Sequence, residues 1–448
     1  MLGNMHVTVI KDDRSVFDFT QQLARSKSSL NDSRSFFWKK ALPRVRPFYS
    51  INCNQDPALL QVLSAFPQMG FHCLTRQNVD TALEFVAPDR LFYANPCWTK
   101  ATLRHAQRSD VGLVGFESEA DLNRMAGENV TSRLILNIAL NPNSTDAAAA
   151  LGCNANEAAG LLATAADLSL NCVGVGFTLG SGVFRAALYE QAIEFAAQLF
   201  AVGRSLGLEM SVLNLGGGFP PLTAGFASFE TIGAEISSSL DFFFPREQWP
   251  QLEIVATPGR FFAAGIFALA TPVVGKAEVD ASEITNDDFD AGQVGFVYRI
   301  NEGFYGPFAC RSVANCDPKC APLFGAQVDE GTADLFYGSV LGPDFGDADF
   351  DTVQSQCHLR QMSVGEWLYW ENLGAYSMEN TQTLDDEPAD APQVFYFANE
   401  FDWKNIDPSG VDVEFTASFA NNSDGDNDSA IDSETDDCSL WLFDLYDD

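Results

Sequence analysis

Pro47-Phe48-Tyr49-Ser50-Ile51-Asn52-Cys53-Asn54 opens a series of short apolar runs that alternate with helical patterns as far as residue 256. Runs that are apolar throughout are typical of parallel strands covered on both faces. The predicted strands are 48–52, 70–73, 91–94, 112–114, 134–139, 173–178, 211–215 and 252–255. Amphipathic stretches lie between them, at 58–66, 79–85, 119–125, 157–168 and 189–206. Eight such units predict an α/β fold, a (β/α)8 TIM-type barrel whose functional side chains lie at the carboxyl ends of the strands.

The pattern changes after about residue 261. Predicted strands at 261–274, 294–300, 367–370 and 394–397 are separated by Gly, Pro and acidic loops, without long helices. This arrangement is typical of a C-terminal antiparallel β-domain. Residues 421–448 are rich in Asp and Glu and contain no Lys or Arg, the composition of a disordered tail. The apolar run 440–446 within it is an alternative candidate for docking on a partner.

Composition limits the classes of function. The chain has 448 residues, enough for two domains, and 46% of them are hydrophobic, as in a globular protein. Its formal net charge of −35 argues against binding to nucleic acid or to an anionic membrane. Residues 1–14 lack the apolar core of a secretory signal, and the 10 Cys are expected to be reduced, so we expect a cytoplasmic location, with the nucleus as an alternative. The spacing of Cys310, Cys316 and Cys320 fits no zinc pattern, so no metal site is predicted.

Five further sequence blocks follow in order along the chain. They are Asn95-Pro96-Cys97, Gly180-Ser181-Gly182, Gly216-Gly217-Gly218-Phe219-Pro220, Pro258-Gly259-Arg260 and Glu371-Asn372-Leu373-Gly374-Ala375-Tyr376. Together with 47–54 they resemble the eukaryotic ornithine decarboxylases and their non-catalytic relatives, the antizyme inhibitors. The resemblance spans roughly 41–417 and implies a barrel of the alanine racemase type. It implies an N-terminal segment 1–27 joining the β-domain, a barrel over 28–265, a β-domain over 266–420 and a tail over 421–448.

The resemblance also implies a binding site for the phosphate of pyridoxal phosphate (PLP). A Gly-rich turn at the end of a strand can present N–H groups to a phosphate, and an Arg can pair with it bidentately. We call the matching residues the phosphate cradle: Ser181, Gly216, Gly217, Gly218, Arg260 and Tyr376.

The catalytic positions of the family are changed in this chain. Asn52 stands where the family has the lysine that forms a Schiff base with PLP, and an amide nitrogen is no nucleophile. Thr257 replaces the Glu that holds the pyridinium nitrogen protonated, and Thr178 replaces the His that stacks on the ring. The other replaced groups are a supporting Asp (here His72), an Arg (Asn137), two substrate-binding Asp (Ala314 and Gly346) and the Cys that assists product protonation (Phe345). A small shift of the alignment would bring Asp344 or Asp347 to the position of Gly346.

No other lysine is placed to replace the missing one. Lys100 is the only Lys between residues 41 and 275. We therefore predict a pseudoenzyme with no catalytic residues and no bound cofactor, although active relatives use PLP. Two alternatives remain: a PLP-dependent ornithine or related amino acid decarboxylase with reduced activity, and a phosphate-ligand-binding module that uses the cradle.

The resemblance implies a protein partner, antizyme, and hence a role in regulating polyamine biosynthesis and uptake. The family's antizyme-binding element corresponds to residues 98–125. The candidate partner-binding residues are Lys100, Arg104, Arg108, Glu117, Glu119 and Arg124. The alternative is that these are two ordinary solvent-facing barrel helices. We expect a monomer or weak homodimer, with a heterodimer with an ornithine decarboxylase as an alternative, because the loop that active relatives contribute across their dimer has lost its Cys and Asp.

Overall fold

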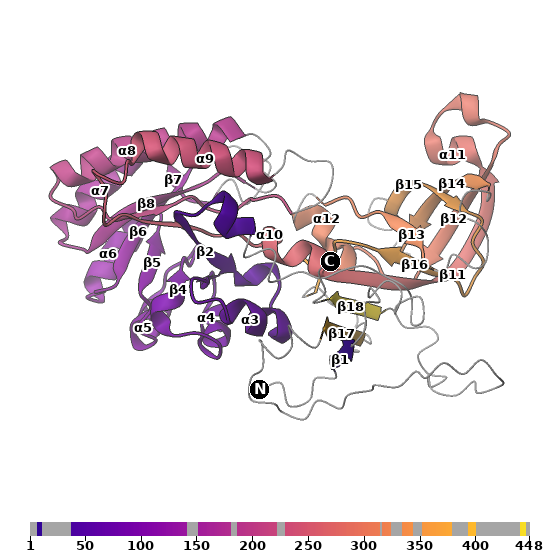
Figure 1. Ribbon diagram of the computed structural model, residues 1–448, viewed down its shortest axis with the longest axis horizontal. Helices are drawn as coiled ribbons and strands as arrows, with labels where there is room; N and C mark the ends of the chain where they lie inside the picture. Colours follow the sequence, from indigo (N-terminus) through magenta and orange to yellow (C-terminus); the bar gives the residue numbers. More distant parts are fainter. Residues whose placement is uncertain are drawn as a thin grey trace. The chain divides into compact units, whose positions relative to one another are not determined.

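The computed structural model of the chain forms two compact units (Figure 1). One unit is Asn31–Ala263, and the other combines Met1–Leu30 with Ala264–Asp448. The structure describes residues 7–10, 37–140, 151–180, 186–221, 229–313, 316–323, 334–343, 352–378, 393–399 and 440–444. Among these residues, no helix has the length and apolar character needed to cross a membrane.

The first unit is built on a closed barrel of parallel strands. Its strands are β2 (Val45–Ser50), β3 (Gly70–Cys73), β4 (Leu91–Tyr93), β5 (Leu113–Phe116), β6 (Arg133–Ala139), β8 (Cys172–Thr178), β9 (Val212–Asn214) and β10 (Glu253–Ala256). Each strand pairs in parallel with the next, and β10 pairs with β2 to close the ring. A short strand, β7 (Cys153–Asn154), also pairs with β6. The predicted TIM-type barrel is confirmed.

Helices alternate with these strands. They are α3 (Pro57–Ser64), α4 (Arg76–Leu83), α5 (Lys100–Arg108), α6 (Glu119–Gly127), α7 (Ala158–Asp167), α8 (Ala186–Ser205), α9 (Phe229–Phe243) and the short α10 (Arg260–Ala263). Local capping explains where several begin. The Asp56 side chain accepts hydrogen bonds from two backbone N–H groups at the start of α3, and Thr75 and Thr99 form capping boxes on α4 and α5.

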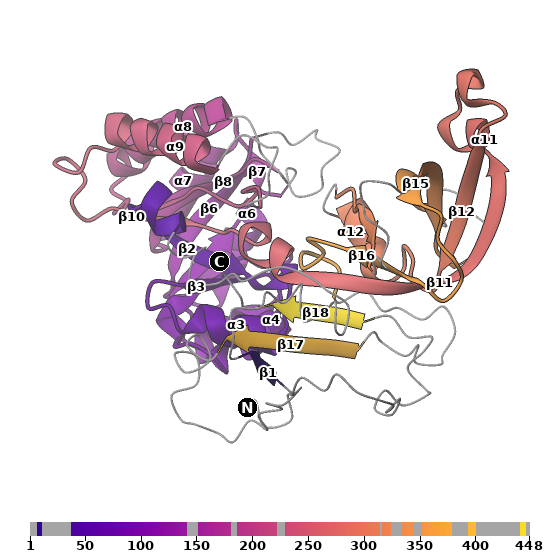
Figure 2. The same cartoon turned by 45° about the vertical axis from the view of Figure 1, so that its right-hand side comes forward.

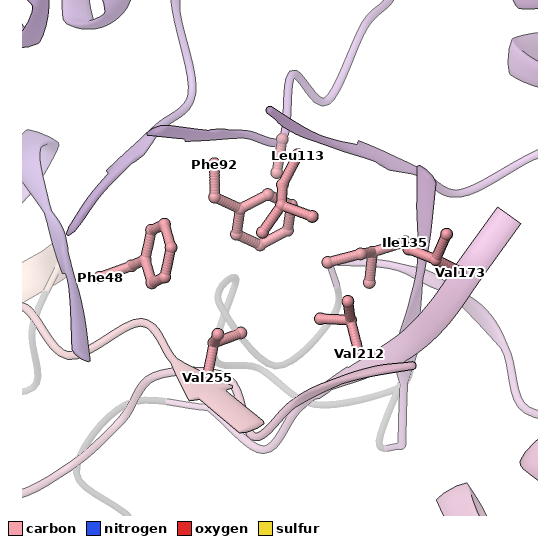
Figure 3. Close-up of a cluster of buried hydrophobic side chains, with 8 residues drawn as sticks. Phe48, Phe92, Leu113, Ile135, Val173, Val212 and Val255 are labelled. Atoms are coloured by element: carbon pink, nitrogen blue, oxygen red, sulfur yellow. The ribbon is translucent and has the colours of Figure 1, made fainter. Parts of the chain in front are cut away.

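The interior of the barrel is a packed layer of apolar side chains. Figure 3 shows these side chains pointing toward one another from the surrounding strands. Its members are Phe48, Phe92, Ala94, Leu113, Ile135, Val173, Val212 and Val255. Strand β3 contributes no side chain to this layer, because its residue opposite Phe48 is Gly70. A Cβ on Gly70 would lie only 2.5 Å from Cδ1 of Phe48, so the Phe48 ring occupies that space. The layer fills this level of the barrel, so functional groups must lie at the strand ends.

The second unit is a mixed sheet organised around one long strand, β11 (Phe267–Asp280). Its other strands are β1 (Val7–Ile10), β12 (Val294–Ile300), β13 (Cys320–Pro322), β14 (Leu335–Leu341), β15 (Thr352–Arg360), β16 (Trp367–Trp370), β17 (Gln393–Asn399) and β18 (Leu440–Asp444). Figure 2 shows β18, β17 and β1 following β11 in that order. Two short helices, α11 (Ala281–Thr285) and α12 (Cys310–Val313), lie in the connections.

Four predictions about these elements need correction. The second sheet is not purely antiparallel, because β12 pairs with β14, β17 with β18 and β1 with β17 in parallel. The apolar run 261–274 begins as α10 and a 3-10 turn before β11, since an apolar run alone does not distinguish helix from strand. Residues 51–52 belong to a 3-10 turn, Ile51–Cys53, rather than to the first strand. Residues 440–444 of the predicted tail form β18, because Leu440–Asp444 find pairing partners in β11 and β17. The tail residues 421–439 and 445–448 lie outside the described residues.

Candidate functional site

The carboxyl ends of the barrel strands gather the predicted catalytic positions at one rim. Since all the strands are parallel, the residues that end or follow them lie on the same side of the barrel. The replaced catalytic positions among them are Asn52 after β2, His72 near the end of β3, Asn137 near the end of β6, Thr178 at the end of β8 and Thr257 after β10. Glu117 after β5 and Asn214 at the end of β9 lie at the same rim, although neither was predicted at a catalytic position.

Asn52 takes part in a chain of neutral hydrogen bonds. The Ser50 hydroxyl donates to Oδ1 of Asn52 over 2.8 Å, and the Ser50 hydroxyl oxygen itself lies 3.1 Å from Nδ1 of His72. Burial lowers the pKa of His72 to about 4, so its imidazole is neutral at pH 7. Because the single Ser50 hydrogen goes to Asn52, Nδ1 of His72 must be the donor to Ser50. The cluster formed by Asn52, Ser50 and His72 thus consists of amide, hydroxyl and neutral imidazole groups, none of which is an amine.

Thr257 and the glycine turn pack tightly against each other. The backbone N–H of Thr257 donates to the Gly216 carbonyl over 2.7 Å. Gly216 and Gly218 have φ angles of +71° and +83°, and a Cβ on Gly216 would lie 2.1 Å from the Phe177 carbonyl oxygen. The turn therefore requires glycine. The Gly216 N–H donates to Oδ1 of Asn214 over 2.9 Å, so this cradle N–H is already used within the protein.

The other cradle residues belong to different parts of the chain. Arg260 begins α10 in the barrel unit, and Tyr376 lies in the second unit with a φ of +62°. Ser181 lies outside the described residues, as do the replaced positions Ala314 and Phe345 and the alternatives Asp344 and Asp347.

Glu117 belongs to the rim and not to the surface of the helices, where we had predicted it. Its half-buried carboxylate accepts hydrogen bonds from the Asn137 side chain and the Gly152 N–H. Burial, reinforced by the nearby Asp121, raises the pKa of Glu117. The physical reason is its place directly after β5, which points it to the strand ends; that position was the signal available in the sequence.

The remaining candidates for partner binding lie on α5 and α6. Lys100, Arg104 and Arg108 are spaced by four residues, so they form a stripe along one face of α5. The side chains of Lys100 and Arg104 are 77% and 57% exposed, and Arg104 Nε lies 2.8 Å from Oε2 of Glu128. We call Lys100, Arg104 and Arg108 the α5 basic stripe. On α6, Glu119 is exposed and Arg124 pairs with Asp121 over 3.3 Å.

Comparison with known proteins places this architecture in a family. The family model described as "Pyridoxal-dependent decarboxylase, pyridoxal binding domain" matches residues 32–264. The ornithine decarboxylase of Panagrellus redivivus is 33% identical over 81% of this chain and 82% of its own length. The chain belongs to the ornithine decarboxylase and antizyme inhibitor family. Antizyme inhibitor 2 of Xenopus laevis is similar too, at 30% identity over 81% of each chain.

Solved structures agree with this assignment. The arginine decarboxylase of Paramecium bursaria Chlorella virus superposes with a TM-score of 0.71 and 25% identity, over 82% of this chain and 93% of that one. The lysine/ornithine decarboxylase of Vibrio vulnificus, at 20% identity and a TM-score of 0.65 over 77% of this chain and 86% of that one, shares the fold. The family thus contains both decarboxylases and antizyme inhibitors, and the site residues must distinguish between them.

The residues present do not fit the chemistry of PLP as the family uses it. At the positions that the resemblance assigns to the cofactor's aldehyde and pyridinium nitrogen, Asn52 would offer no amine, and Thr257 would offer a hydroxyl in place of a carboxylate. The glycine turn is tight, with left-handed φ angles at Gly216 and Gly218, and the Gly216 N–H is already engaged within the protein. Across the described residues, no group of three or more His, Cys, Asp or Glu is arranged to hold a metal ion.

Proposed function

We propose that this chain is a non-catalytic regulator of the antizyme-inhibitor type, which acts by binding antizyme. The observation that carries the proposal is Asn52, held by Ser50 beside the neutral His72 where the cofactor amine of an active relative would be. Without that amine, the covalent chemistry that the family performs on PLP is not available.

Several further losses support the absence of catalysis. Each 1.36 kcal/mol of lost transition-state stabilisation slows a reaction about tenfold. Thr257 and Thr178 remove the pyridinium partner and the ring-stacking group in addition to the anchor. Such losses are not additive, but none of them compensates for another.

The α5 basic stripe supports the partner. In a chain with a formal net charge of −35, the exposed cations Lys100, Arg104 and Arg108 on one helix face form a local patch of opposite sign. Charges at the rim of an interface steer the partner and set its orientation. Glu128 forms ion pairs with Lys100 and Arg104, and both basic side chains nevertheless remain exposed and available to a partner.

The proposal is tested by measuring the affinity for purified antizyme by calorimetry. We expect the wild-type chain to bind, and the double variant R104E/R108E to bind at least about tenfold more weakly because it reverses the stripe. The matched control R246E reverses an exposed cation after α9 and should bind like the wild type. No complex with the wild-type chain at micromolar concentrations would reject the proposal.

A second candidate is non-covalent binding of a phosphate ligand, which the left-handed Gly216 and Gly218 turn favours. Titration with pyridoxal phosphate, followed by thermal shift, tests it. A saturable rise in melting temperature that R260Q removes would support this candidate. An unchanged melting temperature at high ligand excess would exclude it.

A further inference from the structure

The sheet of the second unit has two arms that both start from β11. One arm runs β11–β12–β14–β15, and the other runs β11–β16–β13. Strands β15 and β13 are therefore the outer edges of the two arms. No backbone ladder joins β13 to β15 in the part of the chain that the structure describes, although the two strands lie in contact. We call this boundary between β13 and β15 the seam.

Side chains bridge the seam where backbone pairing does not. The Cys320 N–H on β13 donates to Oε1 of Gln354 on β15 over 3.0 Å. Gln354 is itself fixed, since its Nε2 donates to the Gln356 carbonyl over 3.0 Å. The thiols of Cys320 and Cys357 share a hydrogen bond across the same seam. Cys320 and Cys357 are thus brought to the same seam from the edges of the two arms.

Packing and charge around Cys320 and Cys357 favour the oxidation of these two thiols. A Cβ on Gly338 of β14 would lie 2.8 Å from Sγ of Cys357, so glycine at this position makes room for the sulfur. The hydrogen bond from Cys320, together with the Lys319 ammonium, lowers the pKa of Cys357, and the thiolate is the reactive form of cysteine. Cys357 is 7% exposed whereas Cys320 is only partly buried, so a small oxidant can reach the pair from the Cys320 side.

We propose that Cys320 and Cys357 form a site of reversible oxidation, in which a disulfide closes the seam between β13 and β15 and hydrogen peroxide is the oxidant. The Cys357 thiolate attacks one peroxide oxygen, the O–O bond breaks, and a sulfenic acid and one water form. The Cys320 sulfur then attacks the sulfenic sulfur, the S–O bond breaks, and the S–S bond and a second water form. In total the two thiols lose two electrons and two protons, and the peroxide is reduced to water. A dithiol reductant reverses the reaction.

The disulfide would have a structural consequence. It would link the two arms covalently at their outer strands, so that β11, β12, β14, β15, β13 and β16 form a continuous loop of connected strands. A crosslink that closes the loop from 320 to 357 also restricts the unfolded chain. We expect the melting temperature of the oxidised protein to rise by on the order of 5 °C.

Peptide mapping of the full-length chain tests the proposal. The reduced protein is treated with hydrogen peroxide, its remaining thiols are alkylated, and it is digested without reduction. We expect a linked peptide that contains Cys320 and Cys357 and that disappears on treatment with dithiothreitol. Recovery of both residues as alkylated thiols, or a link from Cys316 in place of Cys320, would overturn the proposal.

Two variants separate this pair from other cysteines. C316S removes a nearby, partly exposed thiol and should keep both the linked peptide and the rise in melting temperature. C320S should lose both. An oxidised C320S protein with the same thermal shift as the wild type would contradict the assignment; if C320S does not fold, the wild-type peptide map decides on its own.

Discussion

At the scale of single residues, the replacement at position 52 is coordinated with its neighbours. A lysine at this place would need a partner for its ammonium, and the family's supporting carboxylate is here His72. With Asn52 present, Ser50 and His72 complete a neutral set of hydrogen bonds that needs no buried charge. The three residues therefore form a self-consistent uncharged cluster.

This neutral cluster predicts a pH dependence of stability. The pKa of His72 is lowered from 6.5 to about 4 in the folded protein, so between these values the unfolded chain binds the additional proton. Stability from this residue is fully present above pH 6.5 and is lost as the pH falls toward 4. From pH 7 to pH 5.5 we expect a loss of about 1.2 kcal/mol that is absent in H72N. Urea unfolding of both proteins at the two pH values measures the difference, and equal losses would contradict the neutral assignment.

At the scale of elements, the local sequence was sufficient to predict the bounds of a strand wherever its own residues form an apolar run between turn residues. Strands β3, β12 and β16 have the predicted bounds, because each is a short apolar run between turn residues. Strand β18 could not be predicted, since its pairing depends on β11 and β17, far away in the chain. Strands β14 and β15 were not predicted, because polar residues and glycine interrupt their apolar runs. Helix α9 was not predicted, because Gly233 and Ser237–Ser239 weaken its helical signal.

For the candidate site, the positions of residues at strand ends were predictable from the sequence, but the hydrogen bonds between them were not. The family blocks located Asn52 and Thr257 at strand ends, where the structure has them. The hydrogen bond between Ser50 and Asn52 was not predictable, because it depends on the 3-10 turn that follows β2. The position of Glu117 directly after β5 indicated the rim, but its partners Asn137 and Gly152 were not predictable, since they come from other parts of the chain.

The glycine turn after β9 gives a prediction about one element. Gly216 combines a left-handed φ with a Cβ position 2.1 Å from a backbone carbonyl oxygen, so G216A should destabilise the barrel by more than about 3 kcal/mol. The control is Gly160 in α7, where nothing lies within 4 Å of an added Cβ. G160A should stabilise the protein by about 0.5–1 kcal/mol, because alanine favours a helix interior. Chemical denaturation measures both, and a neutral G216A would show that the turn is not as tight as described.

At the scale of the whole molecule, the proposed function implies that replaced catalytic positions are spread along the sequence. By the resemblance, these positions include Asn52, Thr178 and Thr257 in the barrel part of the chain and Ala314 and Phe345 further along it. On this proposal the fold has been kept while groups with separate chemical tasks were exchanged. Selection on the scaffold without selection on the chemistry is what a binding role would require.

This distribution predicts that no single reversion restores activity. N52K returns an amine to the end of β2, so pyridoxal phosphate followed by borohydride should leave an adduct at position 52 that the wild type lacks. Carbon dioxide release from ornithine should still be undetectable, because Thr257 cannot hold the pyridinium nitrogen protonated and the ring remains a poor electron sink. N52H, which introduces a basic side chain without a primary amine, is the control for the adduct. Decarboxylation by N52K alone would mean that the remaining replacements are compensated and that the chain is one residue away from an enzyme.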